Sequence, residues 1–218
     1  MSALYPEFSD ACAFVYADDT VMDYDPSETF NVAEEMEVST SVPPPLPLTE
    51  LAQSFATTEE FVQNLPMYSP EEICSIEEAT RNQSSSEEWH SQRKGRITGS
   101  LVHRVVTKVN TLRKEDTRLS KSTKPLLDTL LGANAPNMNI PQLKYGREME
   151  PEAQKAYIHA QRRSGHLKLK VAGCGLYVCA THAYMGASPD GIVECPCCAG
   201  KALLEIKCPF FNVSWRAR

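Results

Sequence analysis

Apolar residues follow a helical spacing through the middle of the chain and a strand-like spacing toward its end. The first helix is predicted to begin near residue 69, where Ser69 is a suitable N-cap, Pro70 fits the first turn and Glu72 completes a capping box. Ile73 and Ile76 then supply its inward-facing stripe. This cap marks the expected start of the ordered domain.

Three further helices are predicted before residue 165. Thr98 is a suitable N-cap for the first of them, and repeated leucines predict the second over about 122–132. The third is predicted from Gly146 to Arg163, with a kink or a restart at Pro151 because proline removes a helical hydrogen bond.

Beyond residue 165 the pattern changes to that of strands. Apolar runs bounded by glycines predict strands over 167–171, 175–180 and 184–186. The segments IVEC and ALLEIKC, residues 192–195 and 202–208, are predicted to be the two arms of a hairpin. Helices followed by a hairpin-linked sheet predict an α+β fold.

Charge divides the chain in a way that its net charge of −6 conceals. Residues 1–80 contain 17 acidic residues and no Lys or Arg, whereas residues 81–218 hold 22 bases against 11 acids, a net charge of +11. This division predicts an acidic, Pro-containing, largely disordered tail over 1–68 and a basic domain over 69–218. Nucleic acid is one expected partner of such a domain. The alternative from charge alone is a soluble domain that carries a disordered tail.

The tail contains SVPPPLPL, residues 41–48, which favours the polyproline II conformation. Its Pro-rich residues 43–47 are suited to an SH3-type groove of a protein partner, although a plain linker explains them more simply. Residues 49–66 are predicted to form a short helix.

The N-terminal residues MSALYPEFSDACAF are acidic and contain no apolar run, unlike a secretory signal or an Arg-rich transit peptide. No apolar stretch approaches the roughly 20 residues of a membrane-spanning helix. Eight cysteines without a secretory signal are typical of a reducing compartment, where thiols stay free or bind metal. We therefore expect an intracellular, soluble protein of the nucleus or cytoplasm, with no membrane partner.

Candidate chemistry is concentrated in the predicted hairpin, GASPDGIVECPCCAGKALLEIKCPF at residues 186–210. The alternation of a strand places Glu205 and Lys207 on one face, a pattern that by itself is most often an exposed ion pair. Asp190 lies at the mouth of the same hairpin, where the returning strand would bring Glu205 close to it. Two neighbouring carboxylates favour a bound cation, and oxygen ligands favour Mg²⁺ or Mn²⁺, which can activate water for phosphodiester hydrolysis.

Four blocks of sequence, in order, resemble one family. SPDG at 188–191 and EIKCPF at 205–210 resemble the core of the PD-(D/E)xK nuclease superfamily and, more narrowly, the phage lambda exonuclease and YqaJ-type viral recombinase family. WHSQRKGRITGS at 89–100 and YGREMEPEAQKAY at 145–157 are similar to two further motifs of that family. The resemblance implies a restriction-endonuclease-like core, in which helices flank a mixed sheet with a catalytic hairpin. It also implies a metal-dependent exodeoxyribonuclease, able to form an oligomer, that acts on double-stranded DNA ends in recombination or repair.

The resemblance implies roles for single residues as well. Glu150 would join Asp190 and Glu205 around the metal, with the main-chain carbonyl of Ile206 as a further ligand. Lys207 would be the catalytic lysine, which orients the attacking water or offsets charge on the phosphoryl oxygens.

Arg93, Ser100 and Ser188 fall where the resembled family binds the 5′-phosphate of a DNA end. An arginine fork suits a phosphate, and a serine near a helix N-terminus adds hydroxyl and backbone donors. Between residues 93 and 124 there are ten Lys or Arg and two acids, a basic stripe expected to hold the DNA backbone without sequence preference. Trp89 is expected to be a core anchor.

Cys195, Cys197 and Cys198 are predicted to lie at the tip of the hairpin. Zinc usually takes four tetrahedral ligands, often from two Cys-x-x-Cys knuckles, and a second knuckle is missing from the sequence. The interpretation that we favour is a tight turn of reduced thiols, with a zinc site as the alternative. The five histidines are scattered and are expected to be structural or surface residues.

Members of the resembled family continue after the catalytic lysine with further strands and a helix, whereas this chain ends eleven residues after Lys207. We therefore expect a core that is incomplete at its C-terminus. The alternative functions are a catalytically inactive DNA-binding or protein-interaction module and, as a third, a zinc-binding adaptor.

Overall fold

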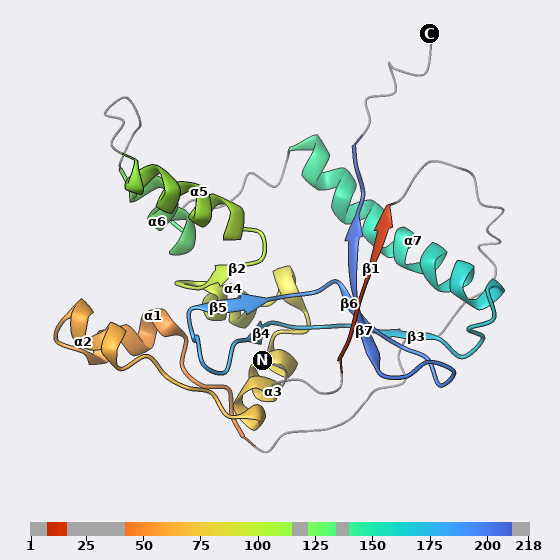
Figure 1. Cartoon of the computed structure of the whole chain (residues 1–218), viewed down its shortest axis with the longest axis horizontal. Coiled ribbons are helices and arrows are strands. Elements are labelled where there is room, and N and C mark those ends of the chain that lie inside the picture. Colours follow the sequence, from red (N-terminus) through yellow and green to blue (C-terminus); the bar gives the residue numbers. More distant parts are fainter. Residues whose placement is uncertain (1–7, 17–41, 115–121, 134–139, 211–218) are drawn as a thin grey trace, which may run out of the picture. The chain divides into compact units, whose positions relative to one another are not determined.

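The computed structural model describes residues 8–16, 42–114, 122–133 and 140–210, the first of these ranges by its backbone alone. The chain forms two compact units, whose helices and strands are labelled in Figure 1. The helical unit comprises Val38–Ala135 and Cys174–Ser188. The hairpin unit comprises Met1–Glu37, Pro136–Gly173 and Pro189–Arg218.

The helical unit consists of short helices and a small mixed sheet. Its helical elements are α1 (Leu48–Leu51), η1 (Ala52–Ser54), α2 (Thr58–Gln63), α3 (Pro70–Ala79), η2 (Gln83–Ser85), α4 (Glu87–Arg93), α5 (Val102–Arg113) and α6 (Lys124–Leu130). In the sheet, β5 (Met185–Ala187) lies between β2 (Ile97–Thr98), which is parallel to it, and β4 (Tyr177–Val178), which is antiparallel.

The predicted capping box of the helix that begins near residue 69 is confirmed in atomic detail. The Ser69 hydroxyl accepts a hydrogen bond from the Glu72 N–H at 3.2 Å, and the Glu72 carboxylate accepts one from the Ser69 N–H at 2.8 Å. Such a cap contributes about 1 kcal/mol. Ile73 and Ile76, the predicted inward stripe of α3, are buried in the core of the helical unit.

The helix predicted to follow Thr98 begins later than expected. Thr98 belongs to β2, and α5 begins at Val102 without a side-chain cap. Thr98 was therefore wrongly predicted as an N-cap, because its backbone pairs with Gly186 of β5, a partner far away in sequence. The helix predicted over 122–132 is confirmed as α6.

The hairpin unit is built on a four-stranded mixed sheet in the order β1-β7-β6-β3. Its strands are β1 (Phe8–Tyr16), β3 (Lys170–Ala172), β6 (Gly191–Glu194) and β7 (Lys201–Lys207), and β1 is the parallel neighbour of β7. Helix α7 (Pro141–Arg163) packs on this sheet through Ala153 and Ile158, which share a core with Leu204 and Ile206 of β7. The predicted α+β class is confirmed.

Two elements of the hairpin unit differ from their predictions. Helix α7 begins at Pro141, five residues before the predicted Gly146, and continues through Pro151 without a restart. Strand β1 lies in the segment for which the sequence predicts no regular structure, and its backbone pairs with the edge of β7. Of the tail predicted to be largely disordered, residues 1–68, most of 1–41 lie outside the described residues, so disorder there stays a prediction. Within 42–68, by contrast, the chain forms α1, η1 and α2, and Leu48 is buried in the core of the helical unit. Among the described helices, none is long and apolar enough to cross a membrane.

Arg96 is the largest fully buried side chain of the helical unit. Its guanidinium donates hydrogen bonds to the carbonyls of Gln92, at 2.7 Å, and of Ala183, and to the Tyr68 hydroxyl, at 3.0 Å. These partners come from α4, from the turn before β5 and from the segment before α3. A single cation thus joins three parts of the unit through neutral acceptors, and burial of such a cation is tolerated only when its donors are satisfied.

Replacement of Arg96 is expected to destabilise the protein. Arg96→Met removes the donors and leaves buried oxygens without partners, so the free energy of unfolding should fall by about 3 kcal/mol in chemical denaturation. Arg96→Lys should also destabilise, because one ammonium cannot replace the planar fork. The control is Arg113→Met on the exposed end of α5, which should change the free energy by less than about 0.5 kcal/mol. Equal stability of the two methionine variants would contradict the role given to Arg96.

Candidate functional site

The register of the β6–β7 hairpin places the two predicted hairpin carboxylates at the same end. Gly191 pairs with Leu204, and the Asp190 N–H donates to the Leu204 carbonyl at 3.0 Å, so Asp190 lies beside Glu205. A Cβ atom at Gly191 would come within 2.8 Å of the Val171 side chain. Glycine is therefore required after Asp190 for β6 to pack against β3.

Asp190 is held by a main-chain donor of the opposite strand. Its carboxylate accepts a hydrogen bond from the N–H of Ile206, whose side chain is buried in the core. Partial burial raises the pKa of Asp190, the charge of Glu205 raises it further, and the Ile206 hydrogen bond and Lys207 lower it in part. The net upward shift indicates a carboxylate in surroundings that favour a compensating positive charge.

Glu205 and Lys207 lie on the same face of β7, as predicted, and form an ion pair. Partial burial lowers the pKa of Lys207, but its hydrogen bond to Glu205 and the charges of Glu205, Asp190 and Glu150 outweigh this, and the net shift is upward. Lys207 is therefore an ammonium ion at neutral pH.

Helix α7 brings a third carboxylate to this pair. Burial raises the pKa of Glu150, and the negative charges of Asp190 and Glu205 add to the shift, while Lys207 opposes it. On the same helix, Glu148 and Glu152 are exposed and pair with Lys144 and Lys155. Of these three glutamates, Glu150 alone is half-buried and has a pKa raised by the charges of the hairpin carboxylates.

The structure thus brings Glu150, Asp190, Glu205 and Lys207 within electrostatic range of one another, as the sequence predicts. The oxygens of these three carboxylates are not, however, all within 4.8 Å of one another. Among the described residues, that criterion is met by a different group of candidate metal ligands, which is described below. Asp190 is turned toward the N–H of Ile206, and Glu205 toward Lys207. An all-oxygen donor set of this kind suits Mg²⁺ or Mn²⁺.

In the helical unit, the three residues predicted to bind phosphate are connected through two neighbours. Trp89 donates from its indole N–H to the Ser188 hydroxyl at 2.9 Å, and the Arg93 guanidinium lies 4.0 Å from the centre of its ring. Arg93 also donates to the Thr98 hydroxyl at 3.3 Å, and Thr98 lies at the same distance from the Ser100 hydroxyl. The sequence predicted Trp89 as a core anchor, and its contact with that core is confirmed.

Arg93 is the charged member of this network. Burial lowers the pKa of Arg93, and its two contacts named above are with neutral groups. Among the described residues no carboxylate pairs with this half-buried guanidinium, and such a group favours a bound anion. The bridging roles of Trp89 and Thr98 were missed from the sequence, because they follow from a ring contact and a hydroxyl contact that no spacing rule predicts.

A third group contains the cysteines named as an alternative zinc site, and the participation of a histidine in it was missed from the sequence. Cys195, Cys197 and Cys198 lie with His166 in one cluster, in which the four candidate ligand atoms are all within 4.8 Å of one another. Hydrogen bonds from Cys197 lower the pKa of Cys195 to about 7, and the interaction with Cys195 raises the pKa of Cys197 to about 11. The prediction that the histidines form no ligand set was therefore wrong for His166. The available signal was a three-cysteine knuckle that lacks its fourth ligand.

Comparison with known families agrees with these observations. The family model of the YqaJ-like viral recombinase domain matches residues 88–217, which contain all four blocks of resemblance. A search of curated proteins found no match. The YqaJ family is part of the PD-(D/E)xK nuclease superfamily. The chain therefore belongs to the YqaJ-like viral recombinase family of nucleases.

Proposed function

We propose that this protein is a metal-dependent exodeoxyribonuclease that hydrolyses phosphodiester bonds at the ends of double-stranded DNA, in recombination or repair. The observation that carries the proposal is the mutual electrostatic influence of Glu150, Asp190, Glu205 and Lys207, three acids and one base contributed by one helix and one hairpin. Membership of a nuclease family supports it.

The acids would hold the metal. Glu150, Asp190 and Glu205 supply carboxylate oxygens, and the main chain of Ile206, adjacent to the Asp190 carboxylate, would supply a carbonyl oxygen. A bound Mg²⁺ or Mn²⁺ supplies Lewis acidity and a water of lowered pKa. The upward pKa shifts of Glu150 and Asp190 support this assignment, because a cation between them would remove the repulsion that contributes to those shifts.

Lys207 would act on the phosphate and the water. Its ammonium is held beside Glu205 by the strand alternation, so it reaches the same space as the carboxylates. There it offsets negative charge on the phosphoryl oxygens as the water attacks. Its raised pKa supports a role as a fixed positive charge rather than as a general base at neutral pH.

The Arg93 network would recognise the terminal 5′-phosphate. Its donors are the Arg93 guanidinium and the hydroxyls of Ser100 and Ser188, which are tied together by Trp89 and Thr98. The basic stripe between residues 93 and 124 would add contacts to the DNA backbone that weaken as the salt concentration rises.

Loss of Lys207 is expected to slow cleavage. On 5′-phosphorylated linear duplex DNA with Mg²⁺, Lys207→Ala should cleave roughly 100-fold more slowly than the wild type or worse, because one fixed charge at the reacting phosphate is lost. Lys201→Ala, at the other end of β7, is the matched control and should remain close to wild type. DNA binding without cleavage by the wild type would instead support the catalytically inactive module.

Glu150→Gln is expected to stabilise the metal-free protein. The pKa of Glu150 is higher in the folded protein than in the unfolded chain, so ionisation of this carboxyl lowers the free energy of unfolding above that pKa. The effect vanishes below about pH 4, where the carboxyl is protonated in the folded and the unfolded protein alike. At pH 7 the variant should therefore melt a few degrees above the wild type, whereas near pH 4 the two melting temperatures should be about equal. Added Mg²⁺ should raise the melting temperature of the variant less than that of the wild type. Glu152→Gln, exposed on the same helix, should behave as wild type. Equal stabilisation of all three proteins by Mg²⁺ would remove Glu150 from the ligand set.

Arg93→Lys is expected to reduce the preference for a 5′-phosphate. The lysine keeps the charge but loses the planar fork, so the ratio of cleavage rates on 5′-phosphorylated and 5′-hydroxyl duplexes should fall about tenfold. Arg104→Lys, exposed on α5, serves as the control and should keep the wild-type ratio. An unchanged ratio in Arg93→Lys would place phosphate recognition elsewhere.

A further inference from the structure

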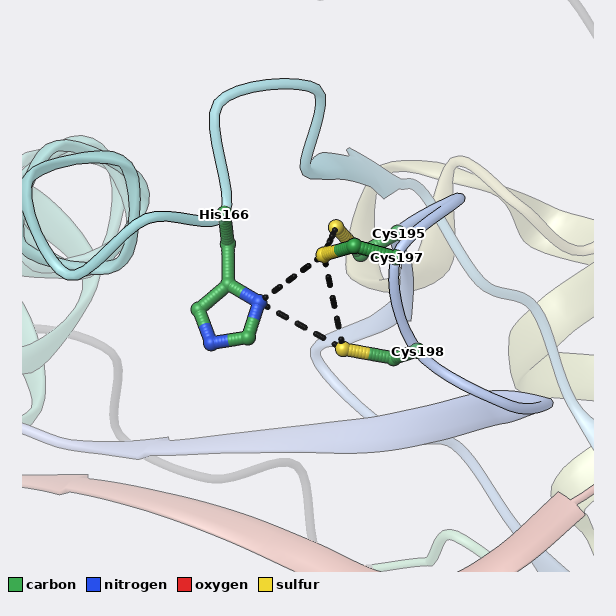
Figure 2. A group of neighbouring side chains, drawn as sticks. All are labelled: His166, Cys195, Cys197 and Cys198. Carbon is green, nitrogen blue, oxygen red and sulfur yellow. Dashed lines mark hydrogen bonds between the residues drawn. The ribbon is translucent and has the colours of Figure 1, made fainter.

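We propose that His166, Cys195, Cys197 and Cys198 form a structural zinc site that is separate from the carboxylate site. Figure 2 shows the imidazole of His166 directed by its Nδ1 atom at the thiols. The proposed site lies wholly within the hairpin unit.

The separations among the Cys197, Cys198 and His166 ligand atoms fit a tetrahedral zinc ion. The Cys197 and Cys198 sulfurs are 3.8 Å apart, and His166 Nδ1 lies 3.3 Å from the first and 3.4 Å from the second. Zinc–sulfur bonds of about 2.3 Å and zinc–nitrogen bonds of about 2.0 Å imply edges of roughly 3.8 Å between sulfurs and roughly 3.6 Å between sulfur and nitrogen. The Cys195 and Cys197 sulfurs, 2.8 Å apart, would separate by about 1 Å to meet this geometry.

The hairpin tip presents the three sulfurs from a short turn. Strand β6 ends at Glu194, and the Cys198 N–H donates to the Cys195 carbonyl at 3.0 Å, which closes the turn C-P-C-C. This hydrogen bond holds the outer cysteines at knuckle spacing, with the third thiol between them. The turn alone supplies three ligands, so one further donor completes a tetrahedron.

The end of α7 supplies that donor. The chain leaves the helix through Gly165, whose φ of +102° suits glycine, and the His166 N–H donates to the Gln161 carbonyl at 3.1 Å. The His166 carbonyl in turn accepts from the Leu169 N–H at 2.9 Å. Two main-chain hydrogen bonds thus hold the backbone of His166 in place beside the hairpin tip.

The donor chemistry selects zinc and excludes the metals suited to the carboxylate site. Three thiolates and one imidazole are soft and borderline ligands, whereas Mg²⁺ and Mn²⁺ prefer oxygen. Four protein ligands leave no open position for water or substrate, which is the arrangement of a structural site. A disulfide between two of the cysteines would leave the third thiol and the histidine without a common role, and the four residues are free thiols and an imidazole in this structure.

The consequence of zinc binding would be to pin α7 to the hairpin. The helix carries Glu150 about 20 Å from its C-terminal end, and Asp190 lies about 16 Å along β6 from Cys195. The zinc would therefore contribute no ligand to the carboxylate site, but it would tie together the two elements that supply that site's acids. This consequence rests on the proposed nuclease function, whereas the zinc site itself does not.

Metal analysis of the intact 218-residue chain tests the site. Protein purified under reducing conditions should contain one zinc per chain, and Co²⁺ substitution should produce the intense thiolate-to-cobalt absorption of a tetrahedral site. Cys197→Ser and His166→Ala should each bind zinc roughly 100-fold more weakly in competition with a chromogenic chelator, and Cys197→Ser should also weaken the cobalt charge-transfer band. Cys74→Ser and His103→Ala, exposed residues of the helical unit, should retain one zinc.

The outcomes separate the zinc site from the proposed function. Absence of stoichiometric zinc in the wild type, or cobalt spectra without thiolate absorption, would overturn the inference even if a variant failed to fold. Glu150→Gln should keep its zinc, and loss of the metal in that variant would contradict two separate sites. Zinc binding by a wild type that does not cleave DNA would refute the nuclease function and leave the zinc site standing.

Discussion

The antiparallel register of β6 and β7 is the constraint on which the rest of the hairpin unit depends. It sets Gly191 opposite Leu204, so that Asp190 and Glu205 share one end of the ladder, and it leaves Cys195 at the other end. A slip of one residue would turn Glu205 and Lys207 into the core and expose Leu204 and Ile206. The register is secured by those buried side chains and by the close approach of β3 to Gly191.

The carboxylate cluster works against folding in the absence of a cation. Glu150 and Asp190 are both partly buried beside other acids, and both have raised pKa values. Lys207 offsets part of this repulsion, and the N–H of Ile206 satisfies one oxygen of Asp190. A local conflict of this kind is typical of functional sites, where a sequence departs from what stability alone would select.

Hard and soft donors are kept apart by the length of one hairpin. The candidate oxygen ligands lie at its open end and the candidate sulfur ligands at its tip, with a hydrophobic core of α7 and the sheet between them. Because ligand softness decides metal choice, this separation would allow two different metals to bind one small unit without competing. The first group is suited to chemistry on a phosphate, and the second is suited to holding α7 against the strands.

The sequence by itself determined the features that depend on near neighbours: the cap of α3 at Ser69, the helix α6, the alternation that pairs Glu205 with Lys207, and the family of the chain. These rest on spacings of two to four residues or on short motifs, which are readable without coordinates. Only the tertiary structure decided that Thr98 pairs as a strand, that Arg96 is buried, and that His166 meets cysteines some thirty residues later in the chain. Such contacts close long loops, and their stability comes from burial and from hydrogen bonds between distant segments, which leave no periodic trace in the sequence.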